Sequence, residues 1–326
     1  MKEVRLGNTN LRVTNIALGT GALGSRFDDS TSLKILDRYF GEGCNFIDTA
    51  NVYGRWNQGN RPLSELLIGK WMKAHHLRNH LVIATKGCAD SQDSIGKRRV
   101  SRQSILEDIH NSLSNLGTDY IDLYYIHQDD PSVSVSEILD TLNELKAEGK
   151  IRYFGCSNWS AERIREADEY AFSHECESFS VNEIMFNMAK ANDDVVSAAT
   201  QSHMNREMFQ YHTGSKLPVA AYTSQAAGYF ALYRQNDFLT SPRFSFPRDF
   251  FHNSITVERA ERANTLSQLK GYTPLEITIG FLFAQPFQVI PIIGPWNEQE
   301  LLESLKASDT VLSEVELNYI LGGLEF

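Results

Sequence analysis

Four polar or ionisable residues stand where strand-like segments of the sequence end. Asp48, Lys86 and His127 close three short apolar runs, and Tyr53 follows Asp48 by five positions. A tyrosine, whose ordinary pKa is about 10, acts as a general acid when a nearby cation favours its ionised form. Lys86 would supply that charge, Asp48 would hold the ammonium, and His127 would hydrogen-bond a substrate carbonyl. The set is suited to protonating an alkoxide as it forms, which is what hydride addition to a carbonyl requires.

Each of these residues also has a purely structural interpretation. A strand-end aspartate such as Asp48 often caps a helix, and a single histidine such as His127 is more often structural than catalytic. Four such residues at the same level of neighbouring strands are harder to explain in this way. No activated Ser or Cys nucleophile accompanies them.

Short apolar, β-branched or aromatic runs alternate with longer segments of helical period. Most of the runs lack polar alternation, as parallel strands covered on both faces do. The predicted strands are 16–20, 45–50, 81–86, 121–127, 151–157, 179–186, 217–222 and 289–294. Eight strands, each followed by helical sequence, predict a (β/α)8 TIM barrel, in which the carboxyl ends of the strands converge at the site of chemistry.

The segments between the strands contain the residues that typically start and end helices. Helices are predicted at 32–43, 64–76, 101–117 and 135–149, and Thr273-Pro274-Leu275-Glu276 combines an N-cap, a first-turn proline and a capping-box glutamate. Residues 4–13 predict an N-terminal β-hairpin before the first barrel strand. Residues 229–254 predict a long loop after the seventh strand. No linker interrupts the pattern, which favours one domain over 1–326.

A glycine string near the N-terminus offers a competing fold. Gly19, Gly21 and Gly24 match GxGxxG, and Asp48 ends the next strand, as in a Rossmann dinucleotide-binding unit. That fingerprint needs a helix to open within the glycines, whereas the helical period starts only near Ser32. A Rossmann-type dehydrogenase is therefore the weaker alternative.

Composition excludes several other classes. The chain has 326 residues, a formal net charge of −10 and 42% hydrophobic residues, which is ordinary for a globular protein. The acidic balance argues against nucleic acid as a partner. No apolar run is long enough for a spanning helix, the N-terminus has no secretory pattern, and the four cysteines form no CxxC pair, so we expect a cytoplasmic protein. No cluster has metal-ligand spacing, so we expect no metal. The sequence leaves the oligomeric state open.

Several motifs together resemble one known family. The segments are Asp48-Thr-Ala-Asn-Val-Tyr53, Ala84-Thr-Lys86-Gly, Ile126-His127, LGNTNLRVTNIALGTG near the start, GKIRYFGCSNW at 149–159 and VIPIIG at 289–294. They resemble the corresponding segments of the bacterial-type aldo-keto reductases, and the likeness extends over essentially the whole chain. The resemblance implies a (β/α)8 barrel that reduces an aldehyde or ketone with NAD(P)H, usually NADPH, or oxidises the alcohol, without a metal.

The resemblance also assigns roles to individual residues. It makes Asp48, Tyr53, Lys86 and His127 a catalytic tetrad with Tyr53 as proton donor. Ser157 and Asn158 would contact the nicotinamide carboxamide, Tyr222 would stack on the nicotinamide, and 223–228 would cover the pyrophosphate. The full set of implied cofactor contacts is Thr20, Gly21, Asp48, Ser157, Asn158, Glu183, Tyr222, Thr223, Gln225, Gly294, Pro295, Trp296, Asn297, Glu300 and Ser304.

Two positions depart from the family pattern. Glu183 stands where the family usually has a glutamine that contacts the carboxamide, and a carboxylate there can accept but not donate. The segment 298–303 is acidic where relatives place a cation for the 2′-phosphate of NADP. We therefore expect NAD(H) to be at least competitive with NADP(H). The alternative is that these glutamates point to solvent along the first turn of a helix.

The predicted rim of the site mixes aromatic and hydrogen-bonding residues. It consists of Arg26-Phe27, the run Arg55-Trp56-Asn57-Gln58, Trp159 and the 229–254 insert. Such a rim suits a small-molecule carbonyl or alcohol that is sugar-like or a polyol, with Tyr53, Trp56 and His127 contacting it. A second functional class stays open, because some members of the family, such as the potassium-channel β subunits, act as cofactor-binding sensors or regulatory subunits with little turnover.

Overall fold

The apolar runs of the sequence form parallel strands whose side chains are buried on both faces. The computed structural model describes residues 1–56, 59–89, 99–198 and 201–323. The strands are β1 (Glu3–Arg5), β2 (Arg12–Thr14), β3 (Ala17–Gly19), β4 (Phe46–Asp48), β5 (Val82–Gly87), β6 (Ile121–Ile126), β7 (Ile151–Ser157), β8 (Asn182–Met185), β9 (Val219–Tyr222) and β10 (Val289–Ile293). All residues of β5, β6 and β10 are buried, which explains why these segments show no polar alternation.

The described α-helices lie between these strands and after them. They are α1 (Asp29–Gly41), α2 (Leu63–His75), α3 (Arg102–Leu116), α4 (Val135–Ala147), α5 (Ala161–Ser173), α6 (Asp193–Ala198), α7 (Arg206–Ser215), α8 (Tyr229–Leu232), α9 (Ser245–Phe251), α10 (Ser254–Lys270), α11 (Pro274–Phe283), α12 (Glu298–Lys306) and α13 (Glu314–Leu321). None of the described helices has both the length and the apolar character that a membrane span needs.

The strand order identifies the fold class. The parallel strands form a closed barrel in the order β10-β3-β4-β5-β6-β7-β8-β9. This is the (β/α)8 barrel that the sequence predicts, and β1 pairs with β2 as the expected antiparallel hairpin, with Val4 opposite Val13. The Rossmann alternative is wrong, because α1 begins ten residues after Gly19, at Asp29, with Asp28 as its N-cap.

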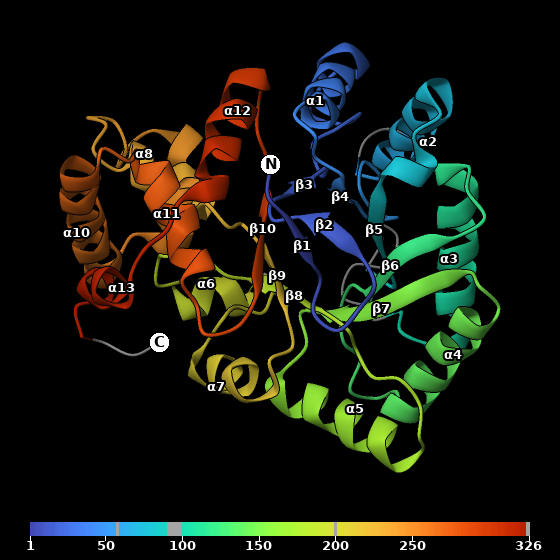
Figure 1. The fold of residues 1–326 in the computed structure, drawn as a ribbon. Coiled ribbons are helices and arrows are strands. Elements are labelled where there is room, and N and C mark those ends of the chain that lie inside the picture. The colour runs from blue at the N-terminus through green and yellow to red at the C-terminus, as the bar shows by residue number, and fades with distance from the viewer. Residues whose placement is uncertain (57–58, 90–98, 199–200, 324–326) are drawn as a thin grey trace. The chain divides into compact units, whose positions relative to one another are not determined.

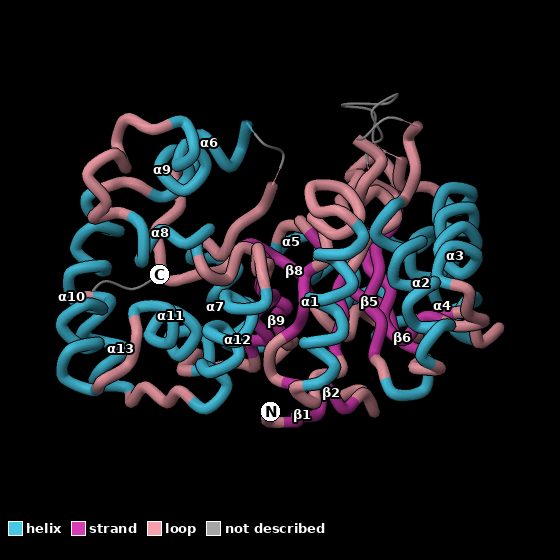
Figure 2. The backbone as a smooth tube through the Cα atoms, turned by 90° about the horizontal axis from the view of Figure 1, so that it is seen from above, coloured by secondary structure: helices cyan, strands magenta, loops and turns pink. Residues whose placement is uncertain are grey.

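The described residues form two compact units, one within Glu3–Glu183 and the other from Ile184 onward. In the first unit, α2 packs on α3 and α3 packs on α4, and Figure 1 shows these helices following one another outside β5, β6 and β7. Figure 2 shows β5 and β6 on the inner side of α2 and α3. In the second unit, α10 packs on α11 and α13. A single domain over 1–326 stays a prediction.

Local signals set most helix ends where the sequence placed them. Ser101 caps α3 by accepting from the Ser104 N–H, and Gly117 ends the helix in a left-handed conformation. Thr273 and Glu276 form the predicted capping box of α11. The start of α1 lies three residues earlier than predicted, because Asp28 accepts a hydrogen bond from the Thr31 N–H and caps the helix there.

The predicted insert at 229–254, which follows β9, is partly helical, since it contains α8 and α9. Its aromatic side chains pack against one another: Tyr229 stacks on Tyr233 with ring centroids 5.6 Å apart and meets Phe238 edge-on at 5.5 Å. Tyr229 Oη also lies 2.8 Å from His252 Nδ1. These contacts give the insert an aromatic core of its own, so Tyr229 and Phe238 are buried residues of that core.

A buried carboxylate at the amino-terminal ends of β5 and β6 holds two partly exposed arginines. Asp122 is 1% exposed, and its carboxylate accepts from Ile83 N at 3.0 Å, Arg78 Nη2 at 2.8 Å and Arg152 Nη1 at 2.9 Å. Asp122→Asn removes the negative charge that holds Arg78 and Arg152. We expect it to lower the free energy of unfolding by about 3 kcal/mol, measured by chemical denaturation.

The exposed pair between Arg102 and Glu144, at 2.6 Å, supplies the matched control. Glu144→Gln should lower the free energy of unfolding much less, because solvent screens that pair. Equal losses in the two variants would show that the Asp122 cluster does not have the stabilising role that its burial implies.

Candidate active site

Backbone hydrogen bonds carry the strand register just past the carboxyl ends of β4 to β8. Asn51 N donates to Lys86 O at 2.9 Å, His127 N donates to Gly87 O at 3.0 Å, and Asn158 N donates to Glu183 O at 3.3 Å. Each bond fixes a residue that lies just beyond one strand against a residue of a neighbouring strand. The four predicted tetrad residues are thereby brought into one cluster in the first unit.

Lys86 lies at the centre of this cluster and is completely buried. Its Nζ donates to Asp48 Oδ1 at 2.6 Å and to Thr49 O at 2.9 Å, and it lies 3.5 Å from Tyr53 Oη. The ammonium therefore contacts both the predicted proton donor and the carboxylate that holds it. Burial opposes the charge, but the adjacent carboxylates Asp48 and Glu183 raise the pKa of Lys86, so we assign it as charged.

Glu183 is a fifth member of the cluster that the chemistry of the sequence did not suggest. Its Oε1 lies 3.3 Å from Lys86 Nζ, and the residue is 2% exposed. The sequence flagged Glu183 only as a departure at an expected carboxamide contact. Its pairing with Lys86 has no local sequence signal, because the two residues are 97 positions apart and meet through the order of the strands.

Tyr53 projects into the cluster from the turn after β4. Burial raises its pKa to about 12, Lys86 opposes that rise, and the carboxylates of Asp48 and Glu183 add to it. Tyr53 is therefore a protonated phenol at neutral pH. Gly21 lies beside the ring, since a Cβ at that position would be 3.8 Å from Tyr53 Cε2.

His127 meets the ring of Tyr53 edge-on, with centroids 6.1 Å apart and planes at 78°. Burial and the neighbouring charge of Lys86 lower the pKa of His127 to about 3. The imidazole is therefore neutral, with one ring nitrogen able to donate a hydrogen bond. Its Nδ1 is buried and has no hydrogen-bond partner among the described residues.

The end of β7 places Ser157 and Asn158 next to the histidine. Asn158 adopts a left-handed backbone conformation with φ of 60°, which asparagine tolerates better than most residues. Its Nδ2 lies 3.1 Å from both His127 O and Ser157 Oγ. Ser157 is buried. The predicted carboxamide pair is thus tied to the backbone of the predicted substrate-binding residue.

Thr20 is occupied by internal hydrogen bonds. Its Oγ1 donates to Asp48 O at 2.9 Å and lies 2.8 Å from Ser64 Oγ, and the residue is fully buried. Its hydroxyl therefore supports the end of β4. This is a structural role that the sequence did not suggest for a residue expected to contact cofactor.

The predicted rim residues have different environments. Trp56 is 41% exposed, and its ring lies 6.1 Å from that of Tyr53. Arg55 Nε donates to Asn51 O at 2.9 Å. Trp159 was expected at the rim, but it is completely buried against Phe179 at 4.9 Å between ring centroids, so it is a core residue.

The remaining rim positions add less. Arg26 is exposed and Phe27 is half-buried. Asn57 and Gln58 lie outside the described residues. The rim interpretation therefore depends on Arg55 and Trp56.

The predicted cofactor residues of the second unit come from the segments that follow β9 and β10. Tyr222 ends β9, and its Oη donates to Ser202 O at 3.2 Å. Thr223 follows in a left-handed conformation with φ of 52°. Gln225 Nε2 donates to Ser304 Oγ at 2.8 Å, which joins the loop after β9 to α12. Tyr222, Thr223, Gln225 and Ser304 thus belong to one connected region of the second unit.

The acidic segment forms the first turns of α12. Gly294 and Pro295 follow β10, and Trp296 is 60% exposed. Asn297 caps the helix by accepting from the Glu300 N–H at 2.9 Å, and Glu300 Oε2 accepts from Trp296 N at 2.9 Å. The Glu300 carboxylate therefore serves the start of its own helix, while Glu298 and Glu303 are exposed.

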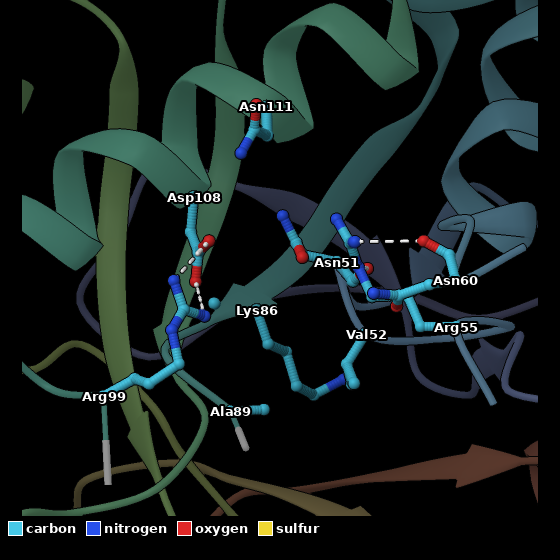
Figure 3. A pocket seen from close by; sticks show the side chains of 10 residues that line it. Asn51, Val52, Arg55, Asn60, Lys86, Ala89, Arg99, Asp108 and Asn111 are labelled. Atoms are coloured by element: carbon cyan, nitrogen blue, oxygen red, sulfur yellow. Dashed lines mark hydrogen bonds and ion pairs between the residues drawn. The ribbon is translucent and has the colours of Figure 1, made fainter. Parts of the chain in front are cut away.

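A polar cavity of about 280 Å³ lies beside the cluster (Figure 3). On one side Arg99 pairs with Asp108 at 3.2 Å, and on the other Arg55 donates to Asn60 O at 3.3 Å. The described lining residues are Asn51, Val52, Arg55, Asn60, Lys86, Gly87, Ala89, Arg99, Asp108 and Asn111. Lys86 is the tetrad member among them. This cavity is therefore not the space in front of Tyr53 Oη and His127.

Among the described residues, no group of three or more His, Cys, Asp or Glu side chains is arranged to hold a metal ion.

The model of the aldo/keto reductase family matches residues 15–322. The chain belongs to this family. Membership agrees with the resemblance of the sequence motifs. It identifies the protein as an oxidoreductase.

Named relatives of this aldo/keto reductase come from bacteria and fungi. It is 36% identical to aldo-keto reductase YhdN of Bacillus subtilis over 168 residues, 50% of this chain and 49% of that protein. It is 27% identical to the norsolorinic acid reductase of Aspergillus flavus over 327 residues, 96% and 78% of the two chains. It is 25% identical to an aryl-alcohol dehydrogenase [NADP(+)] of Phanerodontia chrysosporium over 338 residues, 95% and 82%.

The lowered pKa of His127 predicts an imidazole that stays neutral in weak acid. An ordinary histidine, with a pKa of about 6.5, is mostly protonated at pH 5, whereas His127 should remain unprotonated. The nitrogen chemical shifts of its ring, assigned by comparison with His127→Asn, should not change between pH 8 and 5. A protonation step near pH 6 would contradict the burial of this ring.

The same shift has a consequence for stability. The pKa of His127 is lower in the folded protein than in the unfolded chain. As the pH falls, His127 is therefore protonated less in the folded protein than in the unfolded chain. The contribution of His127 to the free energy of unfolding is fully present above about pH 6.5. It is lost as the pH falls towards the folded-state pKa of about 3.

Proposed function

We propose that the protein transfers a hydride between a nicotinamide cofactor and an aldehyde or ketone, or its alcohol, with Tyr53 as the proton donor. The observation that carries the proposal is the contact of one buried ammonium with both Asp48 and Tyr53, at 2.6 and 3.5 Å from Lys86 Nζ. A cation at that position stabilises the phenolate left when Tyr53 gives up its proton.

The residues of the cluster divide the work. As a hydride reaches the carbonyl carbon, negative charge builds on the carbonyl oxygen, and Tyr53 Oη delivers the proton that makes it an alcohol. The neutral ring of His127 donates a hydrogen bond to the same oxygen and orients it. Asp48 keeps Lys86 charged and in place. Because the cluster is buried, these electrostatic interactions are screened less than they would be in water.

The donor and acceptor groups next to His127 fit a nicotinamide carboxamide. Ser157 Oγ lies 3.1 Å from Asn158 Nδ2 and accepts from it, which leaves the serine proton for the carboxamide oxygen. A reduced nicotinamide would supply the hydride. The other proposed cofactor contacts are those given by the resemblance, with Gln225 and Ser304 joined by a hydrogen bond that would hold the loop after β9 against α12.

For the substrate, we propose a polyhydroxylated or sugar-like carbonyl compound. The support is the exposed Trp56 ring beside Tyr53, which can cover an apolar face of such a compound. The relatives named as norsolorinic acid reductase and aryl-alcohol dehydrogenase favour a second candidate, an aromatic carbonyl or alcohol.

A panel of aldoses, ketoses, aliphatic aldehydes and aryl aldehydes, followed through NAD(P)H absorbance at 340 nm, tests the reaction and the substrate class together. We expect turnover of at least one class, higher kcat/KM for the hydroxylated carbonyls, and a loss of at least 1000-fold in kcat in Tyr53→Phe, equivalent to about 4 kcal/mol. The variant should bind NAD(P)H nearly as wild type does, because it lacks only the phenolic hydroxyl.

The outcomes separate the alternatives. Tight NAD(P)H binding without turnover of any carbonyl would favour a cofactor-binding sensor or regulatory subunit. Higher kcat/KM for aryl aldehydes would overturn the sugar-like substrate. Retained activity in Tyr53→Phe would refute the proton-donor role.

We further propose that NAD(H) is at least competitive with NADP(H). The support is the run Glu298 to Glu303, which holds three carboxylates and no Lys or Arg. A dianionic 2′-phosphate next to these exposed glutamates would be repelled, whereas a ribose hydroxyl could donate to a carboxylate. We expect kcat/KM with NADH to be within tenfold of that with NADPH or higher. An NADPH preference above tenfold, about 1.4 kcal/mol, would exclude this cofactor assignment.

A further inference from the structure

Two carboxyl groups and one ammonium group are buried together at the centre of the cluster. Asp48 Oδ1 and Glu183 Oε1 lie 2.6 and 3.3 Å from Lys86 Nζ, and all three residues are at most 3% exposed. If both carboxyls were ionised, the group would carry a net charge of −1 with almost no water to solvate it. Such a charge is costly in a protein interior, where a titratable group binds or releases a proton instead.

The hydrogen bonding of the two carboxyls leads to the same requirement. Asp48 Oδ2 and Glu183 Oε2 are buried and receive no hydrogen bond from the described residues. An ionised carboxylate can only accept, so two facing carboxylates cannot satisfy each other. The other oxygens of the two carboxyls lie 2.6 and 3.3 Å from the same Lys86 Nζ, so the two groups are near neighbours. Burial raises the pKa of both carboxyls, and the charge of Asp48 adds to the rise for Glu183. One proton between them satisfies both oxygens and neutralises the cluster.

The distances indicate which residue holds the proton. Asp48 makes the shorter contact with Lys86 and is therefore the better-stabilised anion. Glu183 lies farther from the ammonium, and burial together with the charge of Asp48 raises its pKa well above the usual range, with Lys86 only partly opposing this. Its other titratable neighbours are Tyr53 and Tyr125, neither of which supplies a cation.

We propose that Glu183 carries a proton that it shares with Asp48, and that it is a positioning residue which keeps the Lys86 cluster neutral and thereby sets the acidity of Tyr53. With Glu183 protonated, Asp48 alone balances Lys86, and ionisation of Tyr53 brings the cluster to −1. With Glu183 ionised, the same step would bring it to −2 and would hold the proton on Tyr53. The link to Tyr53 rests on the proposed function, whereas the protonation state does not.

Infrared spectroscopy of the free protein tests the proton without any turnover. At pH 7 we expect a carbonyl stretch of a protonated carboxylic acid that is absent in Glu183→Gln. Labelling glutamate with ¹³C at the side-chain carboxyl should shift this band, whereas labelling aspartate should not. A band that shifts only with labelled aspartate, or no such band, would overturn the proposal.

Glu65 supplies the matched control for that experiment. It is also fully buried, and burial raises its pKa, but it accepts hydrogen bonds from Thr85 at 2.7 Å and Asn115 at 2.8 Å outside the Lys86 cluster. The band removed by Glu183→Gln should persist in Glu65→Gln. Labelling separates glutamate from aspartate, and comparison of Glu183→Gln with Glu65→Gln then separates the two buried glutamates, so a band that either variant leaves in place cannot belong to the residue it replaces.

Kinetics test the effect on Tyr53. Glu183→Gln is neutral, and its amide can donate to Asp48 Oδ2, so it should lose less kcat at pH 7 than Glu183→Ala. Glu183→Ala removes that donor and should lose at least tenfold. Asp48→Asn removes the counterion of Lys86 and should lose at least 100-fold, about 2.7 kcal/mol. The pH profiles of wild type and Glu183→Gln should coincide near neutrality and separate only on the alkaline side, where Glu183 ionises.

The outcomes distinguish this proposal from the proposed function. A profile for Glu183→Gln displaced by a full pH unit at neutrality, or a larger loss than in Asp48→Asn, would show that Glu183 is ionised and would overturn the proposal. If wild type reduces no carbonyl at all, the proposed function fails, and the infrared band still decides the protonation of Glu183.

Discussion

The candidate active site depends on holding one ammonium group out of water. Lys86 has no exposed surface, so its charge is stable only because Asp48 Oδ1, Thr49 O and Glu183 Oε1 surround Nζ within 3.3 Å. The same exclusion of water leaves its field on Tyr53 only weakly screened. An exposed lysine at this position would be solvated and would influence the tyrosine much less.

The parallel strands supply what that constraint demands. The barrel strands β4, β5 and β8 contribute Asp48, Lys86 and Glu183, and backbone bonds beyond the strand ends hold Asn51, His127 and Asn158 in register. Since adjacent parallel strands end at the same level, side chains distant in sequence meet there. The short apolar strands are therefore part of the site, because a slip in their register would separate the charges.

The cluster was predictable as far as residue type and strand position determine it. Asp48, Tyr53, Lys86 and His127 stand at strand ends or in the following turn, and the structure brings all four together. The surroundings of the Trp159 and Glu183 side chains were harder to predict from the sequence. An aromatic residue after a strand can line a site or enter the core, and packing against Phe179 decides the latter for Trp159. Tyr229 of the insert likewise enters a core, because it packs on Tyr233 and Phe238.

The sequence by itself determined the fold class, the strand and helix positions and the four polar residues that gather at the strand ends, because apolar period, caps and strand-end residues are local properties of the chain. Only the tertiary structure decided that Glu183 lies beside Lys86, that Thr20 supports Asp48, and that the Glu300 carboxylate accepts from the Trp296 N–H. The reason is physical. The charge state of a buried carboxyl depends on how many cations and donors surround it, and those neighbours come from strands that the sequence does not place at measurable distances.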